Sequence, residues 1–149
     1  MPLPSPSSFV CLEVISRADC VGTGLLVKQR ALLLGWNGFE AAELCLIVVE
    51  LAINSVRHGR GGECFVALDH QRLVLVVLDE GPGFSPEVLS DHGRTDGMNR
   101  SGPVPPGKRA PGRLGSGLAS TRRLADELVL ENRLPRGARI VARRELRSP

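Results

Sequence analysis

Three short segments of the chain carry acids, amides and glycines whose types suit one polar ligand. Glu50 and Asn54 lie four residues apart within an apolar run, and Asp79 opens the turn Asp79-Glu80-Gly81-Pro82-Gly83. The third segment, Leu114-Gly115-Ser116-Gly117-Leu118, places glycines where a loop becomes a helix. Each segment alone is weak evidence, but together they predict a nucleotide site.

The acid and the amide of the first segment belong to a polar stripe on a predicted helix. At about 100° per residue, the polar side chains fall within an arc of roughly 100° on an otherwise apolar helix; they are Glu43, Glu50, Asn54, Arg57 and His58. An amide oxygen such as that of Asn54 suits Mg²⁺, and Glu50 can deprotonate a nucleophile. The plain alternative is a stripe that faces solvent. Arg57 and His58 are second-rank candidates that would make local hydrogen bonds or cap the helix.

Asp79 follows the apolar run Leu73 to Leu78, so its carboxylate lies at a strand end. The small residues Gly81 and Gly83 let a flat ring approach the backbone while the acid accepts a hydrogen bond from an exocyclic amine, and adenine carries such an amine. The alternative is that this segment is merely a turn, since Gly and Pro are the usual turn residues.

The glycines of the third segment place free N–H groups at a helix start, which is a ready anion site. The alternative there is a flexible hinge with a helix cap. A nearby segment, Gly102 to Arg109, has P-loop-like spacing, but Arg109 occupies the Ser/Thr position and three prolines remove the N–H donors that would cradle phosphate. We therefore reject a P-loop.

Composition narrows the class of protein. The 149 residues and 42% hydrophobic content predict one compact domain. The net charge of +3 comes with four Phe and one Trp, so nucleic-acid binding is unsupported. The cysteines form no CxxC pair, which argues against a zinc cluster, and the apolar runs are too short to cross a bilayer. Residues 1–8, rich in Pro and Ser, predict a disordered tail without a signal peptide, and the reducing cytosol is the expected location.

The predicted elements position these segments. The pattern predicts strands over 9–15, 63–68, 73–78, 128–132 and 138–143, and helices over 21–34, 39–58 and 116–126, with Ser16 or Asp19 as the first cap. Residues 80–112 hold many prolines and glycines, so they cannot form a long regular element, although a helical turn near 86–90 is allowed. This order predicts an α/β fold with helices layered on one face of a mixed sheet.

The order of the three segments resembles the N, G1 and G2 boxes of the gyrase, heat-shock chaperone, histidine-kinase and mismatch-repair (GHKL) ATPase superfamily. The resemblance extends from about residue 9 to residue 144, and it is closest to the free-standing anti-sigma-factor serine/threonine kinases and RsbT-type switch kinases of bacterial partner switching. It implies a two-layer Bergerat-type sandwich with a mostly antiparallel sheet, and a mobile ATP lid over 85–111 within a single domain over 9–149.

The resemblance also implies roles for individual residues. Glu50 would be the catalytic base, Asn54 the Mg²⁺ ligand and Asp79 the adenine acceptor. The remaining ATP contacts would come from Gly81, Gly83, Leu114, Gly115, Ser116, Gly117 and Leu118. The implied activity is ATP-dependent phosphorylation of a serine or threonine on a STAS-domain antagonist, in catalysis that is mostly positioning and electrostatics.

The chain departs from the family pattern in three places. Ser116 replaces the usual Leu, Ala138 stands where relatives often have Thr, and the lid is long and rich in proline. Two other functions stay open: a nucleotide-binding module that sequesters or activates a regulator without kinase activity, and a detached histidine-kinase catalytic domain. Partner expectations beyond the STAS substrate are a sigma factor or a phosphatase regulator, with a homodimer left open and neither nucleic acid nor membrane expected.

Overall fold

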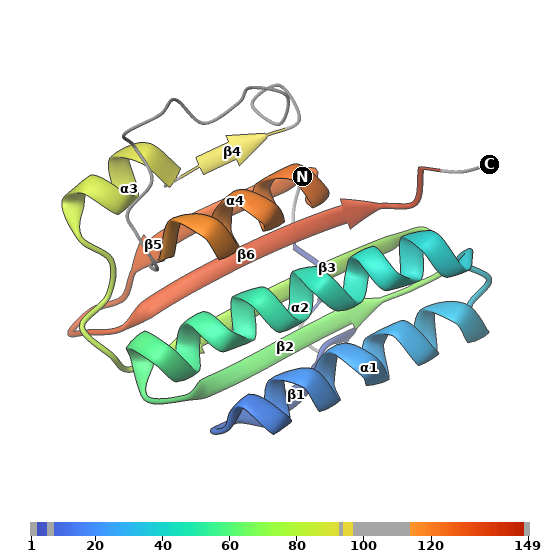
Figure 1. Cartoon of the computed structure of the whole chain (residues 1–149), viewed down its shortest axis with the longest axis horizontal. Helices are drawn as coiled ribbons and strands as arrows, with labels where there is room; N and C mark the ends of the chain where they lie inside the picture. Colours follow the sequence, from blue (N-terminus) through green and yellow to red (C-terminus); the bar gives the residue numbers. More distant parts are fainter. Residues whose placement is uncertain (1–2, 6–7, 93, 97–113, 148–149) are drawn as a thin grey trace.

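The computed structural model describes residues 3–5, 8–92, 94–96 and 114–147 (Figure 1). These residues form a six-stranded sheet in the order β1-β2-β3-β6-β5-β4. The strands are β1 Val10–Val14, β2 Gly62–Leu68, β3 Arg72–Asp79, β4 Arg94–Asp96, β5 Glu127–Asn132 and β6 Ala138–Glu145. Each strand pairing within the described residues is antiparallel, and the predicted hairpins are β2–β3 and β5–β6.

The helices α1 (Arg17–Leu33), α2 (Gly38–Gly59) and α4 (Leu114–Leu124) lie together on one face of this sheet (Figure 1). A shorter helix, α3 (Pro86–His92), contacts β5. The predicted two-layer α/β sandwich with helices on one face is therefore confirmed. The first part of the predicted lid contains α3 and the unpredicted strand β4, and its residues 97–111 lie outside the described residues.

Helix α1 begins at Arg17, four residues before its predicted start, because a capping box defines its first turn. The Ser16 hydroxyl accepts from the Asp19 N–H at 3.1 Å, and the Asp19 carboxylate accepts from the Ser16 N–H at 3.0 Å. Gly24 lies within this helix because α2 is close: a Cβ there would sit 2.5 Å from Val49 Cγ2. The glycine thus serves the packing of α1 against α2.

The core fills the space between the helices and the inner face of the sheet. Side chains alternate across a strand, so Leu73, Leu75 and Val77 of β3 pack in this core while Val74 and Val76 point to the outer face. Helix α2 contributes much of the opposing surface, with Leu44, Ile47, Val48, Leu51 and Ala52 fully buried. The near-continuous burial of β3 follows from its central place in the sheet.

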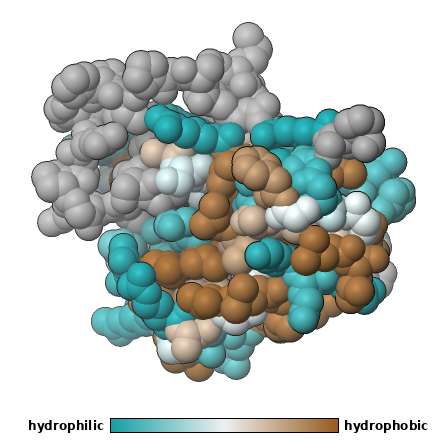
Figure 2. All heavy atoms as spheres, turned by 45° about the vertical axis from the view of Figure 1, so that its right-hand side comes forward, coloured by the Kyte–Doolittle hydropathy of each residue, from teal (hydrophilic) through white to brown (hydrophobic). Residues whose placement is uncertain are grey.

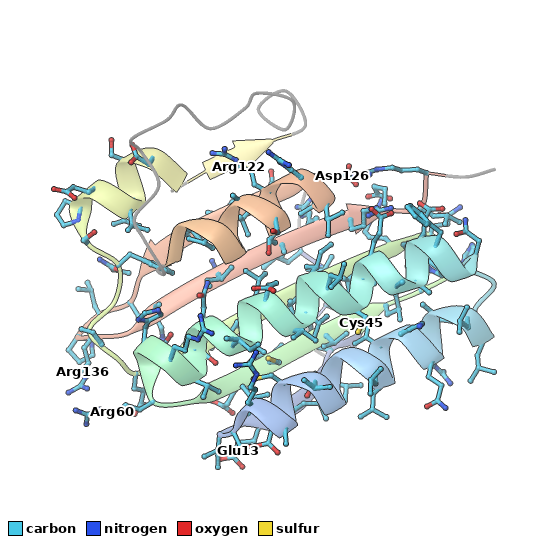
Figure 3. The ribbon with its side chains drawn as sticks, in the orientation of Figure 1. Glu13, Cys45, Arg60, Arg122, Asp126 and Arg136 are labelled. Atoms are coloured by element: carbon cyan, nitrogen blue, oxygen red, sulfur yellow. The ribbon has the colours of Figure 1, made fainter. Side chains whose placement is uncertain are left out.

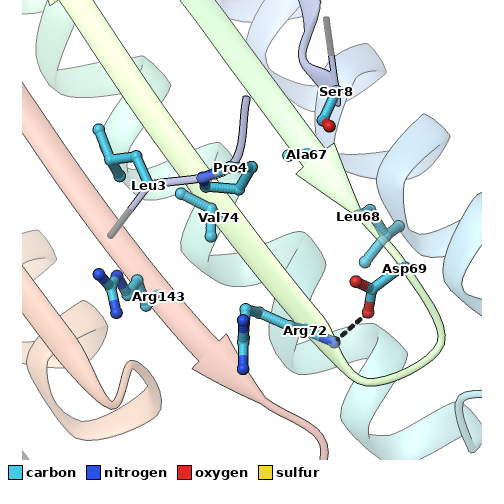
Figure 4. A pocket seen from close by; sticks show the side chains of 9 residues that line it. All are labelled: Leu3, Pro4, Ser8, Ala67, Leu68, Asp69, Arg72, Val74 and Arg143. Carbon is cyan, nitrogen blue, oxygen red and sulfur yellow. Dashed lines mark hydrogen bonds between the residues drawn. The ribbon is translucent and has the colours of Figure 1, made fainter. Parts of the chain in front are cut away.

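The outer face of the sheet is partly covered by the chain's own N-terminal segment. Leu3 and Pro4 line a cavity of about 340 Å³ there, together with Val74, Arg72 and Arg143 (Figure 4). These two residues belong to the stretch that the sequence predicts to be a disordered tail. The structure describes residues 3–5 and 8 of this stretch, with Leu3 and Pro4 against the sheet, and the predicted disorder stays a prediction.

Apolar residues gather on the surface where α1 and α2 lie (Figure 2). The exposed members on these helices are Val21, Leu25, Leu26, Leu32, Leu33, Phe39 and Leu46. None of the helices formed by the described residues has the length and apolar character needed to cross a bilayer.

Candidate functional site

The polar stripe of α2 begins with two carboxylates, Glu40 and Glu43, which both accept hydrogen bonds from Arg144. The Arg144 guanidinium, from β6, is buried and donates through Nη2 to Glu40 Oε1 and to Glu43 Oε1, both at 3.0 Å. Arg144 Nη1 also donates to the Leu124 carbonyl at the end of α4, at 3.1 Å. Sequence reasoning singled out Glu43 but missed Glu40 and Arg144. These three residues join α2, α4 and β6, so their role is structural.

This ion cluster fixes how α4 lies along α2. The two helices contact each other and run in opposite directions, with the end of α4 near the start of α2 (Figure 1). At 1.5 Å per residue, ten residues forward from Glu40 and ten back from Leu124 each cover about 15 Å. The first turn of α4 therefore lies beside the part of α2 that carries Glu50.

That first turn contains the predicted phosphate-binding segment. Leu114, Gly115, Ser116 and Gly117 lie within the helix, which begins two residues before its predicted start at Ser116, and their surroundings lie outside what the structure describes. Leu118 is fully buried in the core and anchors the turn. The predicted contacts of this segment with phosphate stay a prediction.

Further along the stripe, the side chains of Glu50 and Asn54 have no hydrogen-bond or ion-pair partner among the described residues. Asn54 is 8% exposed, and its Nδ2 is buried with no acceptor in the described part of the chain. The half-buried carboxylate of Glu50 makes no hydrogen bond or ion pair with any described residue. An unpaired buried amide costs free energy, so Asn54 lowers the stability of the protein without a ligand. Arg57 and His58 are exposed at the end of the helix.

Asp79 lies at the end of β3, against the end of α2. It is 8% exposed, and its Oδ1 accepts from the Gly81 N–H at 2.9 Å and the Ala138 N–H at 3.1 Å. Its Oδ2 fits against Gly59, where a Cβ would lie 2.5 Å away. Gly59 is five residues beyond Asn54, which is about 8 Å along the helix axis. The structure thus brings Asp79 and Asn54 to the same end of α2, with Oδ2 accepting from none of the described residues.

The glycines of the turn pack closely against neighbouring parts of the chain. Gly81 is buried against the end of α2, where a Cβ would lie 2.5 Å from Gly59 Cα and 2.6 Å from the His58 carbonyl oxygen. Gly83 has a φ of 81°, and a Cβ there would meet Asn132 Oδ1 at 2.6 Å. Both glycines therefore fit the turn to its protein surroundings, and their predicted contacts with a nucleotide stay a prediction.

A second cavity lies around the strand ends and is lined in part by Asp79. It has a volume of about 480 Å³ and is lined by residues of both charges, among them Glu13, Glu80, Arg60 and Arg136. In Figure 3, Arg60 and Arg136 point outward at this end of the molecule.

The cysteines are structural within this fold. Burial raises the pKa of the Cys64 thiol to about 12, and burial also raises the pKa of Cys20 and Cys45. Cys11 is exposed, and slight burial with a hydrogen bond to Glu63 raises the pKa of its thiol. No cluster of three or more metal-ligating acids, histidines or cysteines occurs among the described residues. That finding is compatible with Mg²⁺, which uses few protein ligands and takes its other ligands from phosphates and water.

Comparisons with known proteins found a family and a similar solved structure for this chain. The family model of the histidine kinase-like ATPase domain matches residues 24–144, which is most of the chain. One similar solved structure is a mycobacterial sensor histidine kinase, MprB, with 18% identity and a TM-score of 0.48 over 94% of this chain and 100% of that chain. No curated protein matches. The extent of the family match shows that this chain belongs to the histidine kinase-like ATPase domain family, within the GHKL superfamily.

Proposed function

We propose that this protein is an ATP-dependent protein serine/threonine kinase of a bacterial partner-switching system, and that it phosphorylates a STAS-domain antagonist. Family membership supports ATP binding and a kinase-like activity. The observation that carries the proposal further is the second half of the α2 stripe. There a buried amide and a half-buried carboxylate, Asn54 and Glu50, have no partner among the described residues.

The adenine end of the proposed site is Asp79. Two backbone N–H groups hold Oδ1, so Oδ2 is the oxygen that accepts from the exocyclic amine of adenine. This arrangement fixes the carboxylate before the nucleotide arrives, and preorganisation of this kind lowers the cost of binding. The triphosphate then extends along α2 toward Asn54 and Glu50.

Asn54 fits Mg²⁺ by its chemistry and by its surroundings. Its amide oxygen is a neutral oxygen ligand, and its buried Nδ2 needs an acceptor that a phosphate oxygen supplies. A bound Mg²⁺ would neutralise charge on the phosphates. Asn54 therefore holds the ion and the phosphates in one place, which leaves Glu50 to act on the acceptor.

The proposed chemical step is transfer of the γ-phosphoryl group to a hydroxyl. Glu50 accepts the proton from the serine or threonine Oγ, as the Oγ–P bond forms and the bond from the γ-phosphorus to the bridging oxygen breaks. ADP leaves with the electrons of the broken bond. Glu50 can serve as the base because no cation in the described part of the chain pairs with it.

A second candidate is a nucleotide-binding module that controls a partner without phosphorylating it. The exposed apolar side chains over α1 and α2 favour this function, because large exposed apolar patches mark interaction sites (Figure 2). The two functions differ in their need for Glu50. A module that only binds has no use for a base at that position.

The test is incubation of the protein with labelled Mg-ATP and candidate STAS proteins encoded in neighbouring reading frames. We expect label on one serine or threonine, and loss of that label with Glu50→Gln. The matched control is Glu63→Gln, the same change on an exposed carboxylate of β2. Because Glu50 has no partner among the residues that the structure describes, its substitution should change the free energy of unfolding by no more than about 0.5 kcal/mol. Partner control that survives Glu50→Gln unchanged would favour the binding module.

A further inference from the structure

Residues at the turn between β5 and β6 make hydrogen bonds to the backbone of the segment from Asp79 to Phe84. Asn132, the last residue of β5, makes two hydrogen bonds to the backbone of Phe84. Its Oδ1 accepts from the Phe84 N–H at 2.7 Å, and its Nδ2 donates to the Phe84 carbonyl at 3.0 Å. Phe84 is thereby fixed at both of its backbone polar groups by a residue 48 positions away.

Neighbouring residues of the same turn hold the start of the segment. Arg133 Nη1 donates to the Asp79 carbonyl at 2.8 Å, and Arg136 Nε donates to the Glu80 carbonyl at 2.7 Å. Gly137, with a φ of 110°, packs so closely on the Asp79 carbonyl that a Cβ would clash. The backbone carbonyls of residues 79, 80 and 84 therefore all accept from one hairpin turn.

The held segment fixes only part of its own shape, through the hydrogen bond from the Gly81 N–H to Asp79 Oδ1 and through the ring of Pro82. Gly81 and Gly83 flank Pro82, and glycine loses more conformational freedom on ordering than any other residue. External hydrogen bonds therefore add to the rigidity of the segment before a ligand arrives. The position of Phe84 affects the shape of the whole turn, because this residue ends the turn and packs in the core, two residues before α3 begins.

We propose that Asn132 is a positioning residue for the nucleotide: by pinning Phe84, it keeps the Asp79 turn in the conformation that receives adenine. This inference rests on the proposed function, since it requires the turn to bind adenine. Asn132 binds only backbone atoms of Phe84, so the interaction depends on the amide of Asn132 and on the path of the chain.

The experiment compares the wild type with Asn132→Ala and Asn132→Asp. The alanine removes both hydrogen bonds, whereas the aspartate keeps the acceptor for the Phe84 N–H and places an oxygen against the Phe84 carbonyl. The control is Arg139→Ala, which lies on the same hairpin and removes an exposed ion pair with Glu131. Two quantities are measured for each full-length protein at a temperature where it is folded: the Kd for Mg-ATP and the exchange rate of the Phe84 amide hydrogen without nucleotide.

We expect Asn132→Ala to raise the Kd for Mg-ATP by about tenfold, as the loss of one or two modest hydrogen bonds implies. Asn132→Asp should also weaken binding, and Phe84 amide exchange should accelerate in both variants. Arg139→Ala should leave both quantities near the wild-type values. A loss of stability without a role in positioning would lower the melting temperature but leave the Kd unchanged.

Two failures are distinguishable. If the wild type itself does not bind Mg-ATP, the proposed function is wrong. If the wild type binds and both Asn132 variants bind equally well, or no worse than Arg139→Ala, the positioning role alone is overturned. A raised Kd without faster exchange at Phe84 would also overturn it, because the effect would then not pass through the turn.

Discussion

The two halves of α2 carry similar polar side chains, but they differ in whether these side chains have partners among the described residues. Near its start, Glu40 and Glu43 both accept from the buried Arg144. Two turns beyond Glu43 on the same side, Glu50 has no partner in the described part of the chain, and neither has the Nδ2 of Asn54. Buried polar groups in a complete interior are paired. The first half of the stripe is therefore part of the fold, whereas Glu50 and Asn54 in the second half carry the unpaired groups that the proposed nucleotide site would use.

Among the substitutions that test this difference, the one at Arg144 should change the free energy of unfolding most. Arg144→Ala leaves two carboxylates without their cation and should lower the free energy of unfolding by about 3–5 kcal/mol. Chemical denaturation measures the loss. The comparison is Arg139→Ala, whose exposed pair with Glu131 should cost about 0.2–1 kcal/mol. Equal losses in the two variants would contradict a structural role for the Arg144 cluster.

A smaller effect on the free energy of unfolding is expected when nucleotide binds beside the second half of α2. Mg-ATP at 100 times its Kd should stabilise the wild type by about 2.7 kcal/mol, read as a rise in melting temperature. Asp79→Asn should lose much of that rise, because an amide nitrogen in place of Oδ2 cannot accept from adenine. Its amide oxygen can still take the two N–H groups that Oδ1 accepts, so the protein without nucleotide should stay folded. An unchanged melt of the wild type at millimolar nucleotide would count against the site.

Substitution of Asn54 should change the free energy of unfolding in the opposite direction to substitution of Arg144. Asn54→Leu removes a buried amide with no acceptor and should raise the free energy of unfolding of the protein without nucleotide by about 1–3 kcal/mol. The same variant should lose the stabilisation by Mg-ATP. Thermal melts with and without nucleotide measure both effects. A variant that is less stable than the wild type and still responds to Mg-ATP would show that Asn54 belongs to the fold.

Local chemistry made most of the fold predictable. The Ser16 cap, the glycine that ends α2 and the β2–β3 hairpin each depend on a few adjacent residues, and all three lie where the sequence places them, within a few residues. The strand β4 was missed because it has three residues in a segment rich in proline and glycine. Its pairing with β5 comes from the sheet and not from its own sequence.

The sequence predicts the residues at the centre of the candidate site but not the long-range contacts that surround them. Glu50 and Asn54 share one helix, so their spacing alone predicts a common side. Arg144 and Glu40 are 104 residues apart, and Asn132 and Phe84 are 48 apart. These contacts depend on strand register, which places the end of β6 near the start of α2, and single-sequence patterns do not encode that register.

The crowding around Asp79 limits how this protein can be redesigned. Gly59, Gly81 and Gly137 each abut another part of the chain so closely that an added methyl group would collide with it. A library that aims to accept a different nucleobase should therefore leave these three positions invariant. Diversity belongs instead at Glu80, whose side chain is exposed on the same turn; Pro82 is exposed too, but its ring fixes the backbone φ between two glycines and should be kept.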